Sequence, residues 1–448
     1  MSGRSDCRPE ALDRLKDLVA ESLEEARRLG ATAAEAGLSV DSGLSVSVRL
    51  GEVETVEHHR GQGFGITVYV GQAKGSASST DLGDKAVRET VAAACRIARY
   101  AAEDPYAGLP DPELLATAFP DLDVFHPWDL DAEGAIRLAV ECEDAARGFS
   151  DDISNSEGAN LNTFQGLRVL GNTLGFLHGY PSSRHSMSCS VIGRRGDSMQ
   201  RDDWWTVSRA PEELEAPASV GRKAAERTVA RLGGRSLSSR QCPVLFAADI
   251  ASGLLGHFIA AIRGSSLYRK SSFLLDRLGQ PVFPEFVRIH EQPYLARALG
   301  SAPYDAEGVA TATRDLVSDG VLQSYVLSTY SARKLGLVTT GNAGGVHNLT
   351  LDPGVLDQSQ LMREMGTGLL VTETLGQGVN IVTGDYSRGA AGFWVEDGEI
   401  AFPVEEITIA GNLRDMFAGI RAIGNDVDLR GNTRTASILI GEMTVAGR

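Results

Sequence analysis

Residues 44–50 read Leu-Ser-Val-Ser-Val-Arg-Leu, and this alternation decides the fold class. Apolar side chains at every second position lie on one face of an extended strand, with serine and arginine on the other. The alternation returns at residues 66–70. Residues 10–29 and 81–101 instead repeat their apolar residues at three- and four-residue steps, which predicts amphipathic helices. We therefore expect an α+β protein whose N-terminal helix–strand–helix domain spans residues 1–104.

Five of the 16 prolines lie within the 25 residues that follow this first domain. Proline lacks an amide hydrogen and fixes φ, so this density excludes a helix or a central strand and predicts a linker over residues 105–130. Residues 131–235 predict a middle α+β domain, with helices at 131–147 and 211–232. Short alternating segments between residues 160 and 206 predict an antiparallel sheet between those helices.

Residues 240–448 predict a β-rich, glycine-rich C-terminal domain. Residues 244–250 form an apolar run that predicts a buried strand, and short helices are expected at 328–336 and 412–423. The dipeptides Asp319-Gly320 and Asp397-Gly398 each stand between alternating apolar runs. Since Asp-Gly favours the left-handed conformations that tight turns need, both predict β-hairpins.

The charge balance excludes some classes of partner. The chain has 43 Lys and Arg against 59 Asp and Glu, a formal net charge of −16. This balance argues against nucleic acid, which needs a basic surface, and against an anionic membrane surface. No apolar run approaches the ~18 residues that a membrane helix needs, and the first residues lack the apolar core of a signal peptide. We expect a cytoplasmic protein.

The residues themselves show no familiar catalytic or cofactor motif. The five cysteines are scattered and odd in number, which predicts neither a disulfide framework nor a zinc ribbon. No two of the eight histidines stand one helical turn apart, as a helix-borne zinc site requires. The Walker-type phosphate loop, the dinucleotide fingerprint and the GxSxG nucleophile motif are also missing.

Five stretches of the C-terminal half are long and unusual in composition. They are SLYRKSSFLLD (266–276), STYSARKLG (328–336), GDYSRGAAGFW (384–394), EITIAGNL (406–413) and GND (424–426). These stretches closely resemble the PmbA (TldE) branch of the TldD/PmbA metalloprotease family, and the resemblance runs over nearly the whole chain. It implies a share in proteolysis, because TldD and TldE chains of that family form a heterodimeric zinc protease that acts on peptides and unfolded segments. The older family name, modulator of DNA gyrase, implies no DNA-binding surface.

The resemblance also indicates where a catalytic site would lie. In the TldD branch an HExxxH helix and a distant cysteine hold zinc, with the glutamate as the base. Here Gly256, His257 and Ala261 stand at the positions of the first histidine, the glutamate and the second histidine, and no cysteine follows Cys242. Glycine and alanine offer no ligand atom. The resemblance thus implies pseudo-active-site positions without catalytic or metal-binding residues in this chain, and zinc is expected in a TldD-like partner.

We expect this chain to bind a TldD-like catalytic subunit and to help hold an extended peptide substrate by strand addition. Glycine-rich loops at residues 376–378 and 384–392 would let a peptide backbone approach. The substrate or interface candidates are Asp385, Tyr386, Ser387 and Arg388, together with Tyr268 and Arg269. For the cluster at 385–388, a hydrogen-bonded loop that only fixes the β-rich domain is an equal alternative.

Two other functions stay open at this point. One is a homodimeric binding or regulatory protein without a proteolytic role, which the sequence does not separate from a non-catalytic subunit because both lack the zinc set. The other is an autonomous hydrolase with an unrecognised site. For His257, packing against its helix is favoured over ligand binding.

Overall fold

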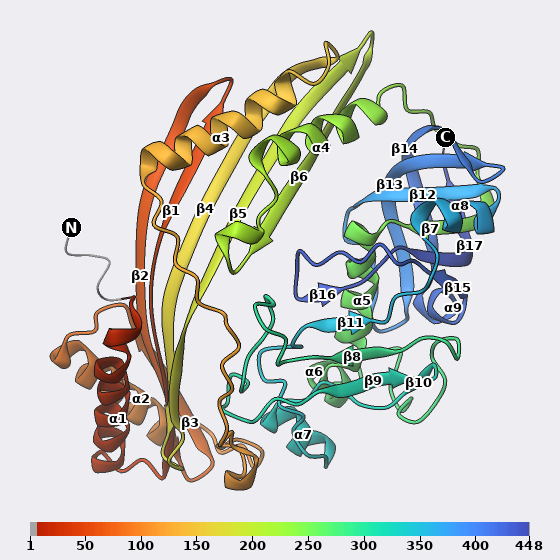
Figure 1. The fold of residues 1–448 in the computed structure, drawn as a ribbon. Coiled ribbons are helices and arrows are strands. Elements are labelled where there is room, and N and C mark those ends of the chain that lie inside the picture. The colour runs from red at the N-terminus through yellow and green to blue at the C-terminus, as the bar shows by residue number, and fades with distance from the viewer. Residues whose placement is uncertain (1–6, 448) are drawn as a thin grey trace.

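A curved antiparallel sheet of six strands dominates the N-terminal half of the computed structural model, which describes residues 7–447 (Figure 1). In spatial order the strands are β3 (Ala73–Ser79), β2 (Glu52–Val70), β1 (Ala33–Arg49), β4 (Ile153–Asn172), β5 (Leu177–Arg195) and β6 (Ser198–Ser208). Because β1 pairs with β4 along most of its length, the sheet crosses the limit expected between the first and middle domains. The domain limits stay a prediction, but these two units share one sheet.

Four helices cover one face of this sheet. They are α1 (Leu12–Arg28), α2 (Asp84–Tyr100), α3 (Ala132–Arg147) and α4 (Pro217–Ala230), in agreement with the periodicity of the sequence. The even-numbered residues of β1 from Ala34 to Val48 are mostly buried beneath them. Burial of such an apolar face is the main stabilising contribution to a helix on a sheet. The side chain of Asp131 caps α3 by accepting a hydrogen bond from the amide of Gly134.

No helix of the described residues covers the opposite face of the sheet, which we call the open face. It carries small and polar residues at the alternate positions of the same strands, such as Ser39, Gly63 and Ser182. Part of this face turns toward the C-terminal half of the chain (Figure 1). The outer edge of β2 from residue 52 to 63 pairs with no strand in the described part of the chain, since β3 covers only residues 64–70.

The segment predicted as a linker runs from the end of α2 to α3 and contains no helix or strand apart from the 3₁₀ turn Pro112–Leu114. It is held at several points along its course. The ring of Phe119 stacks on His178 of β5 at 3.6 Å between centroids. The amide of Ala116 donates to the carbonyl of Gly308 in the C-terminal half.

Two sheets form the C-terminal unit. A six-stranded sheet has the order β14 (Glu399–Asn412), β13 (Asp385–Glu396), β12 (Gly368–Leu375), β7 (Arg240–Phe246), β17 (Ile438–Ala446) and β15 (Ile420–Ile423). A smaller sheet has the order β10 (Val321–Leu322), β9 (Arg314–Ser318), β8 (Ile289–Glu291), β11 (Leu349–Leu351) and β16 (Thr433–Arg434). The helices are α5 (Ala248–Ile262), α6 (Gly264–Tyr268), α7 (Thr329–Leu335), α8 (Gln358–Met365) and α9 (Leu413–Ala418). Helix α5 packs against β12 of the first sheet and β16 of the second, and both sheets share one core.

Three local expectations for this unit are wrong. The strand expected over residues 244–250 ends at Phe246, and the chain enters α5 two residues later. The helix expected over 412–423 stops at Ala418, and Ile420–Ile423 is strand β15. The supposed loop 384–392 is mostly strand β13, whose glycines fit close cross-strand contacts: a Cβ on Gly392 would lie 1.9 Å from the carbonyl oxygen of Leu370.

Both predicted hairpins are confirmed. Asp319-Gly320 joins β9 to β10, and Asp397-Gly398 joins β13 to β14. Both residues of each pair have positive φ, as a tight two-residue turn requires. Among residues 7–447, no helix is long and apolar enough to cross a membrane.

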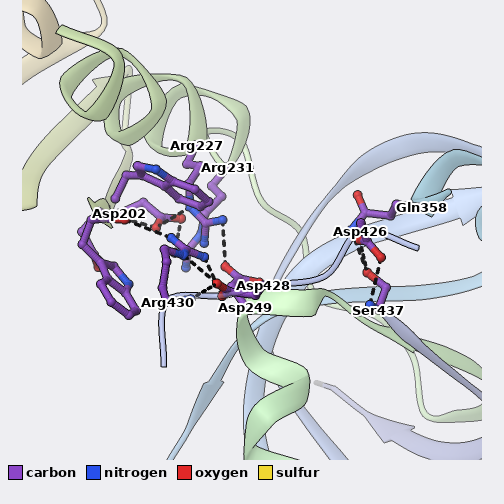
Figure 2. A network of polar contacts seen from close by, with 12 residues as sticks. Asp202, Arg227, Arg231, Asp249, Gln358, Asp426, Asp428, Arg430 and Ser437 are labelled. Atoms are coloured by element: carbon purple, nitrogen blue, oxygen red, sulfur yellow. Dashed lines mark hydrogen bonds and ion pairs between the residues drawn. The ribbon is translucent and has the colours of Figure 1, made fainter. Parts of the chain in front are cut away.

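An ionic network joins the N-terminal sheet to the C-terminal unit (Figure 2). Arg227 of α4 bridges Asp202 of β6 at 3.1 Å and Asp249 of α5 at 3.0 Å. Arg231, one turn further along, pairs with Asp202 and with Glu373 of β12. From the other side Arg430 lies over the ring of Trp204 at 3.8 Å and donates to Asp428. Since Asp249 lies in the first turn of α5, this network fixes the helix on which the pseudo-active-site positions lie.

Candidate functional site

Helix α5 carries the three pseudo-active-site positions in different environments. Gly256 is exposed, and a Cβ placed on it would meet no heavy atom within 4 Å. Ala261 is fully buried in the core that α5 shares with the sheets. His257 is half-buried, and its ring meets that of Tyr386 edge-on at 6.0 Å between centroids. The structure thus brings His257 together with one of the candidate residues of β13.

The imidazole of His257 lies in an environment that disfavours its charged form. Burial lowers the pKa of His257, and the nearby guanidinium of Arg388 lowers it further. Its Nε2 atom is buried and has no hydrogen-bond partner among the described residues. A neutral imidazole with one free nitrogen is therefore the state that this environment favours at pH 7.

The alternation of β13 divides the cluster 385–388 between two faces. Tyr386 is buried toward α5, and burial raises the pKa of its hydroxyl to about 12 although Arg388 opposes this shift. Arg388 also donates to the carbonyl of Thr374 at 3.2 Å. Asp385 is exposed and accepts hydrogen bonds from Thr383 and Asn412, which lie in the neighbouring turn and strand. The exposed Ser387 lies on this second face too.

Tyr268 and Arg269 lie at the end of α6, and their ring contacts are with each other and with α7. The ring of Tyr268 meets that of Tyr330 of α7 edge-on at 5.9 Å, and the guanidinium of Arg269 lies 5.5 Å from the Tyr268 ring. Tyr330 donates to Asp104 at 2.7 Å, and this hydrogen bond lowers the pKa of that carboxyl. Tyr268 and Arg269 therefore lie beside a contact between α7 of the C-terminal unit and Asp104, which follows α2.

The residues present do not fit a zinc ion at the pseudo-active-site positions. Gly256 and Ala261 have no donor atom, and His257 alone cannot complete a tetrahedral set. Nowhere in residues 7–447 do three His, Cys, Asp or Glu side chains gather in a way that could hold a metal ion.

The segment where the resemblance expects the distant cysteine has another arrangement. Ala436 and Ser437 are fully buried there, and β16 just before them packs against α5. Asp426 accepts from the amide of Ser437 at 3.0 Å and from its hydroxyl at 2.6 Å, as Figure 2 shows. Asp426, which the sequence marks only as part of a motif, thus fastens this segment beside α5.

A large cavity lies between the open face of the N-terminal sheet and loops of the C-terminal unit. Its volume is about 1400 Å³. From the sheet, Arg168, Tyr180 and Arg184 line it, with Arg209 beyond the end of β6. The loops around Gly300, Asp305 and residues 343–347 form the other wall. The sequence analysis missed this site because its walls lie far apart in the chain. The one available signal was that Arg168 stands between the apolar residues Leu167 and Val169 in β4.

Comparisons with known proteins agree along the whole chain. Three family models match: PmbA/TldA metallopeptidase domain 1 at residues 34–98, the central domain at 125–232 and the C-terminal domain at 239–447. The chain is 50% identical to Metalloprotease PmbA of Escherichia coli O157:H7, over 97% of this chain and 96% of the relative. It is 48% identical to the Metalloprotease PmbA homolog of Haemophilus influenzae over the same shares.

Solved structures show the same fold. A protein described as a modulator of DNA gyrase from Bacteroides thetaiotaomicron superposes with a TM-score of 0.93 at 28% identity, covering 97% of this chain and 99% of that one. TldE from Thermococcus kodakarensis superposes with a TM-score of 0.85 at 19% identity, covering 96% of this chain and all of the other. At that identity the second likeness supports the fold alone.

Proposed function

Because the chain belongs to the PmbA branch of the PmbA/TldD metallopeptidase family, we propose that it is the non-catalytic subunit of a two-chain zinc protease. Its partner would be a TldD-like chain that holds the zinc, and the substrate would be a peptide or an unfolded segment. The assembly would act in the cytoplasm. In this arrangement the present chain completes the substrate chamber and holds the peptide while the partner supplies the chemistry.

One observation carries the proposal. Helix α5 is packed in the core, and an ion pair between Arg227 and Asp249 holds its N-terminal end. Positions 256 and 261 of this helix nevertheless offer no ligand atom. A metal-activated water requires both an ion and a base close to it. At position 257, where the resemblance expects the base, burial favours a neutral imidazole. The scaffold of a catalytic site without its reactive groups is what a supporting subunit would have.

The experiment is co-expression with a TldD-like chain that carries an intact HExxxH motif. We expect a stable 1:1 complex, and peptide cleavage that a chelator abolishes and that appears only when both chains are present. Metal analysis of the isolated chain should find less than about 0.1 zinc per chain, since the site lacks the four ligands of structural zinc or the three of catalytic zinc. The matched control replaces the glutamate of the partner's motif by glutamine, which should abolish cleavage but keep the complex.

The same experiment has outcomes that contradict the proposal. If the chain remains a homodimer in the presence of the partner, a homodimeric binding or regulatory protein is the better description. If a verified partner-free sample cleaves peptides and loses this activity with a chelator, the chain holds a catalytic metal of its own and the argument from positions 256 and 261 is wrong.

A further inference from the structure

Three arginines converge on the large cavity from neighbouring strands. Arg168 of β4 stands in a cross-strand row with Gly63, Ser39 and Tyr180, on strands β2, β1 and β5. Directly opposite residues in such a row have Cβ atoms about 5 Å apart. Because the residues beside Arg168 toward β2 are a serine and a glycine, that side of its guanidinium has no large neighbour. Arg184 lies four residues beyond Tyr180, on the same face of β5.

Arg209 forms the third side of this arginine cluster (Arg168, Arg184 and Arg209). It donates to the carbonyl of Ser183 at 2.9 Å and to that of Leu299 at 2.6 Å, so it joins the sheet to the C-terminal loops. Its Nε atom is buried without a partner among the described residues. Burial lowers the pKa of Arg209, and the like charges of Arg184 and Arg168 lower it further although Tyr180 opposes them. Arg209 is thus close enough to Arg168 and Arg184 for their like charges to act on it.

No carboxylate among residues 7–447 forms an ion pair with this cluster. Within the described residues, none of the three arginines has an ion pair with an acidic side chain within 4 Å, although Asp and Glu outnumber Lys and Arg in the chain. Among the described residues that line the cavity, Asp305 is the acidic one. Its carboxylate accepts hydrogen bonds from the backbone amides of Glu307, Val309 and Ala343. Burial raises its pKa to about 7, so it offers only part of a negative charge at neutral pH. Asp41 lies two residues from Ser39 on the same face of β1, but its carboxylate lies over the backbone of Gly61 on the neighbouring strand.

We propose that the arginine cluster binds carboxylates of an acidic peptide that lies in the cavity between the open face and the C-terminal loops. The proposal rests on the function proposed above and names the class of substrate. A guanidinium matches a carboxylate with two parallel hydrogen bonds, and an unbalanced cluster gains most from such a ligand. At about 1400 Å³ the cavity exceeds the ~300–1,000 Å³ typical of small-molecule pockets, so it has room for a peptide segment. Gly344 and Gly345 have no close neighbour at the Cβ position and leave the backbone of the opposite wall accessible.

Binding of a defined probe tests the proposal. The probe is a fluorescein-labelled Gly-Ser-Glu-Gly-Glu-Ser-Gly peptide, followed by anisotropy on the isolated chain and on its complex with a TldD-like subunit inactivated at its motif glutamate. Arg168→Gln and Arg184→Gln should each weaken binding about tenfold, which corresponds to one lost charge-assisted hydrogen bond. Both arginines are exposed and have no ion pair with another described residue, so the melting temperature should stay unchanged. The control is the double variant Arg137→Gln/Arg222→Gln on α3 and α4, which changes net charge by two on the helical side.

Four versions of the probe separate the two sources of carboxylate: glutamate or glutamine at both acidic positions, each with a free or an amidated C-terminus. Loss of binding with glutamine indicates side-chain carboxylates, and loss with the amide indicates the C-terminal carboxylate. Equal affinity for all four probes, or equal weakening by the control variant, overturns the proposal. The function proposed above is judged separately by whether the 1:1 complex forms, which these substitutions away from α5 leave unaffected.

Discussion

At residue 257 a neutral imidazole stands where the resemblance expects a catalytic carboxylate. Its ring packs edge-on against Tyr386, and no described residue bonds its buried Nε2. From the sequence, packing against its own helix was favoured over ligand binding for this residue, and this stays a prediction. What the sequence did not indicate was the partner, because Tyr386 lies 129 positions further along the chain.

The first residue-scale prediction concerns pH. Since burial lowers the pKa of His257 below its ordinary value of about 6.5, the unfolded chain binds a proton more readily than the folded one. The contribution of His257 to the free energy of unfolding should therefore be complete above pH 6.5 and should decrease as the pH falls below that value. His257→Gln should reduce this fall in urea denaturation between pH 8 and pH 5. At pH 8 both proteins are neutral at position 257, so the difference in their unfolding free energies gives the cost of the lost packing alone. If the unfolding free energies of the two proteins decrease equally between pH 8 and pH 5, the prediction is contradicted.

A second prediction compares two helical glycines. A Cβ on Gly221 of α4 would lie 1.9 Å from the carbonyl oxygen of Cys142 in α3, so Gly221→Ala should force the helices apart and cost about 2–3 kcal/mol of unfolding free energy. Gly256→Ala meets no neighbour within 4 Å and should instead stabilise by about 0.5–1 kcal/mol, because alanine favours the helix. Thermal and urea denaturation measure both. Equal effects of the two substitutions would show that the helix–helix distance does not decide the result.

Among the elements, those with a clear period could be predicted, and those set by tertiary contacts could not. Helices α1 to α4 and the two Asp-Gly hairpins follow from local pattern and turn chemistry. The strand predicted over residues 244–250 was too long, because a short apolar stretch has no period that separates a buried strand from a buried helix. Here that stretch contains the junction of β7 and α5. The glycines of β13 suggested a loop, since the cross-strand carbonyls that exclude a side chain there are invisible in the sequence.

The segment 424–438 is held beside α5 by one side chain. Asp426 holds both the amide and the hydroxyl of Ser437, which is fully buried. Asp426→Ala leaves two buried polar groups without their partner and should cost about 2–3 kcal/mol. Asp426→Asn keeps one acceptor and adds a donor that the Ser437 hydroxyl accepts, so its cost should be about 1 kcal/mol or less. Urea denaturation distinguishes them, and equal costs would show that this segment is held by packing instead.

Hydrogen bonds and ion pairs at several places join the N-terminal sheet to the C-terminal unit. The ionic network of Figure 2 and the arginine cluster lie at two places along this junction. Neither could be predicted from the sequence: the network combines residues of β6 and α4 with residues of the C-terminal half, and the cluster combines residues of β4 and β5 with Arg209, which donates to Leu299 of that half. The pseudo-active-site positions could be located from the resemblance, but the cavity required the packed units.

The ionic network predicts a non-additive result. Arg227→Met should cost about 2–3 kcal/mol, because it removes the ion-pair partner of Asp249, whose pKa burial already raises, and leaves the more distant Arg430 as the cation nearby. Arg227→Met/Asp249→Leu should recover part of this loss, since it removes the unpaired charge as well. A double-mutant cycle by urea denaturation gives the coupling. Strict additivity of the two substitutions would show that the pair contributes nothing to the junction.

The unpaired edge of β2 has a consequence for the behaviour of concentrated samples. An exposed strand edge can template the strands of other molecules and so begin aggregation. Here the side chains of Val53 and Val56 lie exposed along that edge, with 45% and 41% of their surface accessible. Each valine has a glutamate next to it in the sequence: Glu52 and Glu54 beside Val53, and Glu57 beside Val56. Two molecules that approach edge to edge bring like charges together. Because salt screens such repulsion, colloidal stability of this protein should fall as ionic strength rises.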